Sequence, residues 1–563
     1  RAVKPESIAL GVFGLIALLA ALLITAQAIS RRIRSDVRDL DVLRALGADR
    51  VMTVTGSLLG TIGAIFIGAV AAAVVAVALS PIAPIGAVRR IDPAPGFDLD
   101  WTVLLGGVAS FVVVLSVVST VLALVVTRPP SRSGPSWKTR RVPGAVRAAV
   151  RAGMPPPSVV GIRFAVERNA GRDSVPVSSV LLGAALSVAV VVATLTFASS
   201  LNTLVSRPQL YGWNWSYAIA QPGGGNVPPM AENLLSRDPD VAAWSGFNFG
   251  NASFDGQTVP ILLTRANAPV QPPILSGHAV TGDHEVVLGG ATLAQLHKKV
   301  GDTVVVTYGT PQDAPIYVPP TRVRIVGTAT LPAIGNGATL HPSMGTGAVG
   351  AVGIEPPAMQ AALLSSDPNL NGPPVIAVRL KSGVAPAAGL ASLQRVAAAA
   401  TRIMAHDPNG GGGFSVLPVQ QPAEIVNYRA MGGTPSVLAL ALAVGAVTAL
   451  GLLLIASVRR RRRDLALLKT LGFVGRQLAA VVSWQASLIA LAGLVIGTPI
   501  GIVVGRSLWR LFAGEIYAVP ATSVPVSQLL LVAVGALVLA NAVATVPARL
   551  AAATPAGELL RTE

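Results

Sequence analysis

The sequence predicts an α-helical polytopic membrane protein with one large α+β domain outside the membrane. Hydrophobic residues make up 52% of the 563 residues and the mean hydropathy is +0.63, values typical of membrane proteins. Stretches without charge reach the roughly 20 residues that a bilayer core requires. Seven spans are therefore expected, at about 7–30, 54–79, 101–127, 177–201, 435–458, 478–505 and 526–547.

Positive charge gathers in three of the segments that separate these spans. Segments 31–50, 128–176 and 459–476 carry +2, +8 and +6 of the total charge of +17. Lys and Arg in short loops are retained in the cytoplasm, so these segments and the C-terminus are expected there. Basic residues confined to membrane exits indicate anionic lipid headgroups, and not nucleic acid, as their partner. The absence of Cys excludes disulfides and thiolate metal sites.

A ten-residue pattern occurs twice, 425 positions apart, each time after an apolar run. In each copy, leucines spaced every three residues form an apolar stripe on a short helix, and a glycine follows as its stop. The copies consist of Arg38, Asp39, Leu40, Leu43, Arg44, Leu46 and Gly47, and of Arg463, Asp464, Leu465, Leu468, Lys469, Leu471 and Gly472.

The repeated helices have two interpretations. An amphipathic helix with Arg and Lys can lie on anionic headgroups. An Asp is unfavourable there, yet both copies place one at the same position. This favours docking on a partner protein.

Small residues recur every four positions in the span after each copy, again at an offset of 425. Such spacing lets helix backbones approach closely in lipid. A packing face is therefore expected at Gly68, Ala72, Ala76 and Ser80, and at Gly493, Gly497, Gly501 and Gly505.

The expected organisation has two similar membrane blocks. Residues 1–127 form the first block, with three spans and the helix at about 31–50. A basic cytoplasmic linker (128–176), a fourth span (177–201) and the external domain (202–434) follow. The second block (435–548) has three spans and the helix at about 459–476, and a tail (549–563) ends the chain. If the halves are duplicates, a further span, the eighth, and a first external domain precede Arg1.

The external region shows short β-branched runs at 285–288, 303–307 and 322–326, bounded by Gly, Asp or Pro, which predict strands. Segments 356–366 and 389–404 have helical spacing. Together they predict an α+β domain, with a glycine run at 410–413 leading back to the membrane.

The sequence lacks the residues that several kinds of protein chemistry require. No span contains a charge, which argues against an ion-coupled carrier. No Lys follows a Gly, so a P-loop is excluded and any ATPase is another polypeptide. Asp283, His284 and Glu285 are adjacent on a strand and cannot converge on one metal ion. No catalytic constellation is found.

The chain resembles the FtsX-like permease family, the membrane subunits of MacB-type ABC transporters. The resemblance covers nearly the whole chain, as two FtsX-type blocks around a MacB-type external domain. Short segments in family order support it: 211–215, 285–289, 300–304, 324–327 and 555–561.

The resemblance implies that helices 38–47 and 463–472 are coupling helices on a separate ATPase. Two blocks imply two ATPase copies, which bind ATP and Mg, whereas this chain holds no cofactor or metal. The family commonly has Glu where Asp39 and Asp464 stand. By mechanotransmission in a bacterial inner membrane, the complex is expected to export or extract a lipid, lipoprotein, peptide or drug. The alternative is signalling, in which the external domain activates a cell-wall hydrolase; an external lipoprotein partner also stays open.

Overall fold

The computed structural model describes most of the chain but leaves gaps. The described residues are 50–80, 100–126, 144–166, 177–221, 225–313, 317–331, 344–351, 372–405, 413–419 and 462–552, with isolated positions between 421 and 455. The chain divides into two compact units. Ser200–Arg429 and Trp509–Thr522 form most of one, the α+β unit; the other, the helical unit, comprises Ala9–Ser199, Ala430–Leu508 and Ser523–Glu563.

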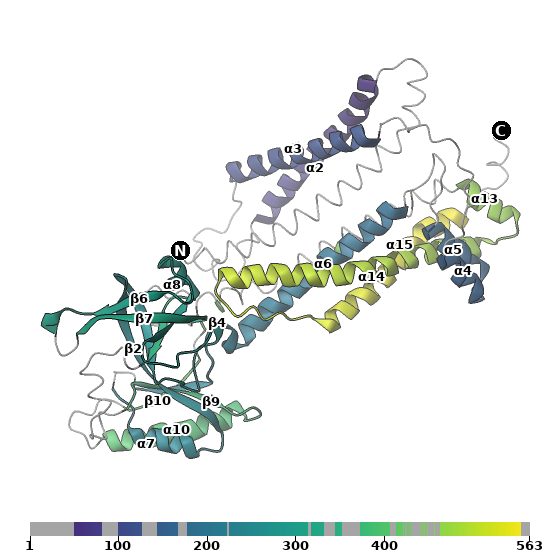
Figure 1. Cartoon of the computed structure of the whole chain (residues 1–563). Helices are drawn as coiled ribbons and strands as arrows, with labels where there is room; N and C mark the ends of the chain where they lie inside the picture. Colours follow the sequence, from purple (N-terminus) through teal and green to yellow (C-terminus); the bar gives the residue numbers. More distant parts are fainter. Residues whose placement is uncertain are drawn as a thin grey trace. The chain divides into compact units, whose positions relative to one another are not determined.

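Five helices among the described residues are long and apolar enough to cross a membrane. They are α2 (Arg50–Leu79), α3 (Trp101–Val126), α6 (Val177–Ser206), α14 (Gly475–Glu515) and α15 (Val526–Ala552) (Figure 1). They confirm five of the seven expected spans as apolar helices. The other two, at 7–30 and 435–458, lie outside the described residues except for isolated positions.

Helix α14 is much longer than the span expected at 478–505. Its 41 residues correspond to about 60 Å, twice the roughly 30 Å of a bilayer core. Both α6 and α14 contribute their C-terminal residues to the α+β unit.

Three short helices complete the described part of the helical unit: α4 (Gly144–Arg151), α5 (Pro156–Val166) and α13 (Arg462–Thr470). The first two lie in the segment expected to be a linker. Gly161 of α5 lies against α14, where an added Cβ would be 2.7 Å from both the Val481 carbonyl oxygen and the Trp484 Cβ. The segment therefore contains packed structure that its Pro- and Arg-rich composition did not indicate.

The α+β unit is built on ten strands in the order β10-β1-β9-β2-β3-β8-β5-β7-β4, with β6 pairing β2 and β7. Their bounds are β1 (Tyr217–Ala220), β2 (Val241–Phe254), β3 (Gln257–Thr264), β4 (Ile274–Gly277), β5 (Glu285–Gly289), β6 (Thr303–Tyr308), β7 (Val318–Ala329), β8 (Ala348–Ala351), β9 (Val375–Leu380) and β10 (Ser415–Pro418). The long strand β2 pairs with β9 along Val241–Phe247 and with β3 along Asn248–Phe254. It thus joins two sheets.

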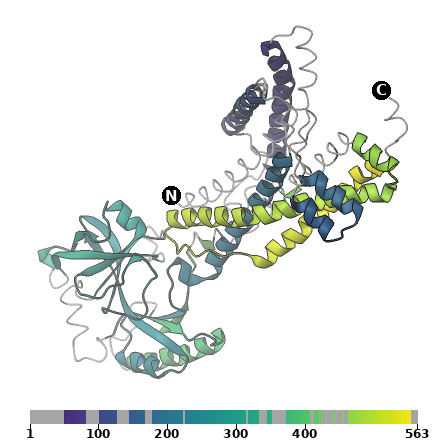
Figure 2. The same ribbon diagram turned by 45° about the vertical axis from the view of Figure 1, so that its right-hand side comes forward.

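Each sheet has its own core. Helices α7 (Pro229–Arg237) and α10 (Pro386–Met404) cover one face of the β1–β9–β2 sheet (Figure 2). In the other sheet, apolar residues of β6 and β7 alternate inward, as period-2 patterning dictates. Helix α8 (Gly290–Gln295) follows β5 directly.

The strands expected at 285–288, 303–307 and 322–326 are confirmed as β5, β6 and β7. The helix expected at 389–404 is confirmed within α10. The other expected helix, at 356–366, and residues 410–412 of the glycine run lie outside the described residues.

Candidate functional site

Helix α13 is the second copy of the repeated pattern. Asp464 lies in its first turn and Lys469 in its last, the arrangement that the helix dipole favours. The helix ends in a Schellman motif at Gly472, which has φ +96°. The Gly472 amide donates to the Lys469 carbonyl (3.2 Å) and the Phe473 amide to the Leu468 carbonyl (3.1 Å). This turn fixes the direction in which α14 begins.

The leucines of α13 divide into two sets. Leu465 is 1% exposed and Leu468 is half-buried, and both pack into the core of the helical unit. That core is formed by Ala165, Leu478, Val482, Ala486, Ile489, Ala544 and Ala548. Leu467 is 50% exposed and Leu471 is 78% exposed. Leu465 therefore anchors α13 to its own chain, and a partner can reach the other face.

We call Leu467, Leu471 and Val474 the exposed apolar face of α13; all three side chains are exposed. The sequence pattern placed Leu465, Leu468 and Leu471 on one stripe, whereas the structure separates Leu471 from the two inward leucines. Periodicity did not show that Leu467 belongs to the open face. Of the remaining predicted residues, Asp464 is exposed, whereas the side chain of Arg463 and the whole first copy, residues 38–47, lie outside the description.

The glycines of α14 form a close interface with α6 inside the helical unit. A Cβ at Gly493 would lie 3.0 Å from the Ala184 Cβ, and one at Gly501 would lie 2.5 Å from the Ala189 carbonyl oxygen. Gly497 and Gly505 meet the Ala185 and Ala193 carbonyl oxygens in the same way. We call these four residues the glycine face; only residues without a Cβ permit this approach.

The corresponding residues of α2 are placed differently. Gly68, Ala72 and Ala76 are exposed among the described residues, and a Cβ at Gly68 would meet nothing within 4 Å. The buried residues of α2 are instead Leu58, Thr61, Ile65 and Ala69. A packing role for Gly68, Ala72 and Ala76 stays a prediction.

The C-terminal end of α14 is held inside the α+β unit. Trp509 and Phe512 are buried, and Phe512 makes an edge-to-face contact with Tyr428 at 5.5 Å between ring centroids. Beyond the helix, the Val519 amide donates to the Leu210 carbonyl (3.0 Å). Tyr517, with a positive φ of +53°, lies directly against Gly290.

A second glycine accommodates Tyr517. A Cβ at Gly345 would lie 2.6 Å from the Tyr517 Cβ. A left-handed backbone is uncommon for a bulky residue, so the surrounding contacts hold Tyr517 in place. The sequence alone gave no signal of this contact.

The histidines do not form a recognisable metal centre in the described part of the chain. No group of three His, Asp or Glu side chains that could hold an ion occurs there. The Glu285 carboxylate instead accepts bonds from the Thr281 amide (2.8 Å) and the Gly282 amide (3.0 Å). The Thr281 amide is the main cause that lowers the pKa of Glu285.

Comparisons with known proteins agree with this architecture. The family model of the FtsX-like permease C-terminal matches residues 11–130 and 436–556, and that of the MacB-like periplasmic core domain matches residues 179–396. The membrane helices and the α+β unit thus define a permease-type membrane protein with a periplasmic domain.

The chain belongs to the FtsX-like permease family and carries a MacB-like periplasmic core domain, as the sequence motifs predicted. The crystal structure of the periplasmic region of MacB from Actinobacillus actinomycetemcomitans is similar at 11% identity, covering 38% of this chain and 94% of that chain, with a TM-score of 0.24. The search of curated proteins found no match.

Proposed function

We propose that this chain is the permease subunit of an ABC transporter and that α13 docks on a separate ATPase subunit. The observation that carries the proposal is the two-sided character of α13: Leu465 is buried in the chain's own core while Leu467 and Leu471 stay open. A helix that only lay on headgroups would not need an anchored inner face. Single exposed apolar residues are ordinary on proteins, but Leu467, Leu471 and Val474 lie on one helix turn and its exit and together form a contact surface.

The same surface belongs to the cytoplasmic side in this proposal. The segment 459–476 carries +6, which supports a cytoplasmic location, and the periplasmic core domain then lies on the opposite side of a bacterial inner membrane. Two blocks of one kind support two ATPase copies per permease, one at 463–472 and one at 38–47. ATP and Mg bind to those ATPase subunits.

Helix α14 supplies a path for mechanotransmission. It begins three residues after the Gly472 turn, and its last residues, from Trp509, belong to the α+β unit. One continuous helix therefore connects the docking helix to Phe512 and, just beyond its end, Tyr517. Movement of α13 caused by closure of an ATPase dimer would be passed along α14 to the periplasmic domain, which acts on a hydrophobic substrate such as a lipid, lipoprotein, peptide or drug.

The docking proposal is tested by charge placed on the exposed face. The double variant Leu467→Asp, Leu471→Asp leaves the Leu465 anchor intact and should lose the ATPase when a tagged permease is purified from its native membrane. Leu234→Asp is the matched control, because Leu234 is an exposed leucine on a short helix of the α+β unit. Full retention of a P-loop ATPase by the double variant, at wild-type membrane levels, would contradict the docking assignment.

A further inference from the structure

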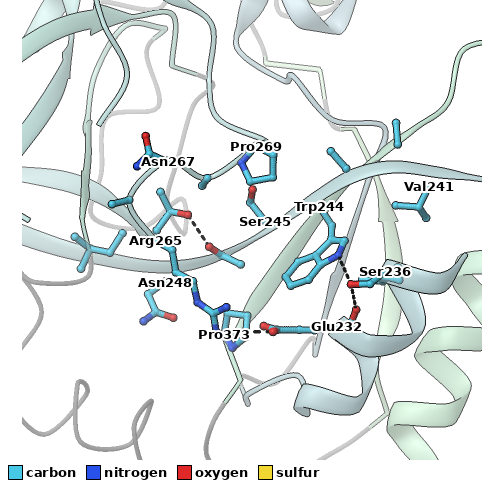
Figure 3. A pocket seen from close by; sticks show the side chains of 18 of the residues that line it. Glu232, Ser236, Val241, Trp244, Ser245, Asn248, Arg265, Asn267, Pro269 and Pro373 are labelled. Atoms are coloured by element: carbon cyan, nitrogen blue, oxygen red, sulfur yellow. Dashed lines mark hydrogen bonds and ion pairs between the residues drawn. The ribbon is translucent and has the colours of Figure 1, made fainter. Parts of the chain in front are cut away.

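A cavity of about 820 Å³ opens in the α+β unit beside the first half of β2 (Figure 3). Its volume is in the range of small-molecule sites, about 300–1,000 Å³. Helix α7, strand β2, the end of β3 and the loop at 265–269 contribute its walls. Two bonds hold that loop on β2: Thr264 Oγ1 donates to the Gly246 carbonyl (2.9 Å), and the Val270 amide donates to Ser245 Oγ (2.9 Å). The cavity is therefore preformed.

The charges around the cavity favour a cation. Among the described residues that line it, three are charged: Glu232, Asp283 and Arg265. The Glu232 side chain is only 15% exposed, and Arg265 Nη2 lies 3.8 Å from its Oε2, at the outer limit of an ion pair. The Arg265 side chain is 73% exposed, so water weakens its attraction to the carboxylate.

Burial supports the same conclusion. Desolvation raises the pKa of Glu232, and Arg265 opposes this effect without cancelling it. The attraction of Arg265 therefore does not offset the full free-energy cost of burying the Glu232 carboxylate. A ligand cation in the cavity would offset more of that cost.

An aromatic side chain of the cavity is linked to the helix turn that carries Glu232. Trp244 Nε1 donates to Ser236 Oγ (3.1 Å), and Ser236 Oγ donates to the Glu232 backbone carbonyl (2.8 Å), so the indole is tied to the turn of α7 that carries Glu232 (Figure 3). Indole faces attract ammonium and guanidinium groups. Pro269 and Pro373 add apolar lining.

We propose that this cavity binds an organic cation with an apolar body, that is, a primary amine or guanidinium group on an aliphatic or aromatic chain. Glu232 holds the charge, and Trp244 contacts the group that carries it. Two kinds of molecule carry such a cation: a free amphiphilic amine, and a peptide with a Lys or Arg side chain. Binding itself does not depend on the ATPase, whereas transport of the bound cation rests on the proposed function.

The test uses the full chain in a neutral detergent, without nucleotide or ATPase. Fluorescence anisotropy of dansylcadaverine, a primary amine on an aromatic body, is compared with that of its N-acetylated, neutral form. The amine should bind at least about tenfold more tightly, and Glu232→Gln or Trp244→Leu should each weaken it roughly tenfold. Glu515→Gln, an exposed glutamate of the same unit that does not line the cavity, should leave binding unchanged.

Two results would overturn the proposal: equal binding of the neutral form, or unchanged affinity in both cavity variants. Melting curves check that each variant is folded. Displacement of the probe by a Leu-Lys-Leu-Lys-Leu peptide at lower concentration than by unlabelled cadaverine assigns a peptide source, and the reverse order assigns a free amine. Absence of binding by all of these cations refutes the cavity site but leaves ATPase co-purification unaffected, so the two proposals fail separately.

Discussion

The glycine face of α14 allows a quantitative prediction. A Cβ at Gly501 would lie 2.5 Å from the Ala189 carbonyl oxygen and 2.7 Å from the Val192 Cβ, whereas ordinary contact begins at 3.4 Å. The two helices must therefore separate by about 0.9 Å at this point in Gly501→Ala, because both obstacles belong to rigid parts of α6. Overpacking of this kind costs about 1–3 kcal/mol.

An opposing effect sets the net magnitude. Alanine is favoured over glycine inside a helix by about 1 kcal/mol, so Gly501→Ala should destabilise the protein by up to about 2 kcal/mol. Gly535→Ala is the matched control on α15, where an added Cβ meets nothing within 4 Å. It gains the helix preference without the clash and should stabilise the protein by about 0.5–1 kcal/mol.

The assay is thermal unfolding of both purified variants in the same detergent. Changes of opposite sign are expected from the same chemical substitution, with a lower melting temperature for Gly501→Ala and a higher one for Gly535→Ala. Equal melting temperatures for the two variants would refute the close contact between α14 and α6.

Three further predictions use other contacts. Because the chain has no cysteine, the pair Ala184→Cys, Gly493→Cys should form a disulfide on oxidation. The two Cβ positions are 3.0 Å apart, about 0.5 Å below the usual range of about 3.5–4.5 Å, so a small separation of the helices brings them into range. A pair that stays reduced would contradict this register. Gly290→Val should displace Tyr517 and speed hydrogen exchange at 515–522. Gly282→Ala should not, because an added Cβ there would lie no closer than 3.7 Å to any neighbouring atom. Equal exchange in the two variants would show that the position of Tyr517 does not depend on Gly290. The lowered pKa of Glu285 means that its stabilisation is present at neutral pH and is lost as the pH falls through that lowered value. Hydrogen exchange at 278–290 should therefore accelerate in acid in the wild type, after allowance for the intrinsic pH dependence, and should show no such extra change in Glu285→Gln.

The sequence predicted those strands and helices that are determined by the pattern of residues close together in the chain. The strands at 285–289 and 303–308 follow from β-branched alternation, and the apolar helices follow from composition. Gly472 was expected as a helix stop, and its left-handed φ explains why a glycine is needed there.

The features that the sequence did not predict depend on contacts between segments that are far apart in the chain. The three-residue leucine spacing did not reveal that Leu465 faces the chain's own core while Leu471 faces outward, because a period does not say which neighbours a helix has. The helices at 144–166 were missed because their packing against α14 depends on Gly161 meeting Val481, a contact between segments more than 300 residues apart. The cavity at Trp244 likewise combines α7, β2 and the loop after β3.

The most direct test of the central claim is site-specific photocrosslinking from α13 in the native membrane. A photoreactive amino acid at Leu471 or Leu467 should form a covalent adduct with a P-loop ATPase, identified by mass spectrometry, and the same probe at the exposed Leu234 should not. ATPase adducts at both α13 positions would establish that the exposed apolar face is the docking surface. Adducts with lipid alone at both positions would contradict ATPase docking and assign α13 to the membrane surface.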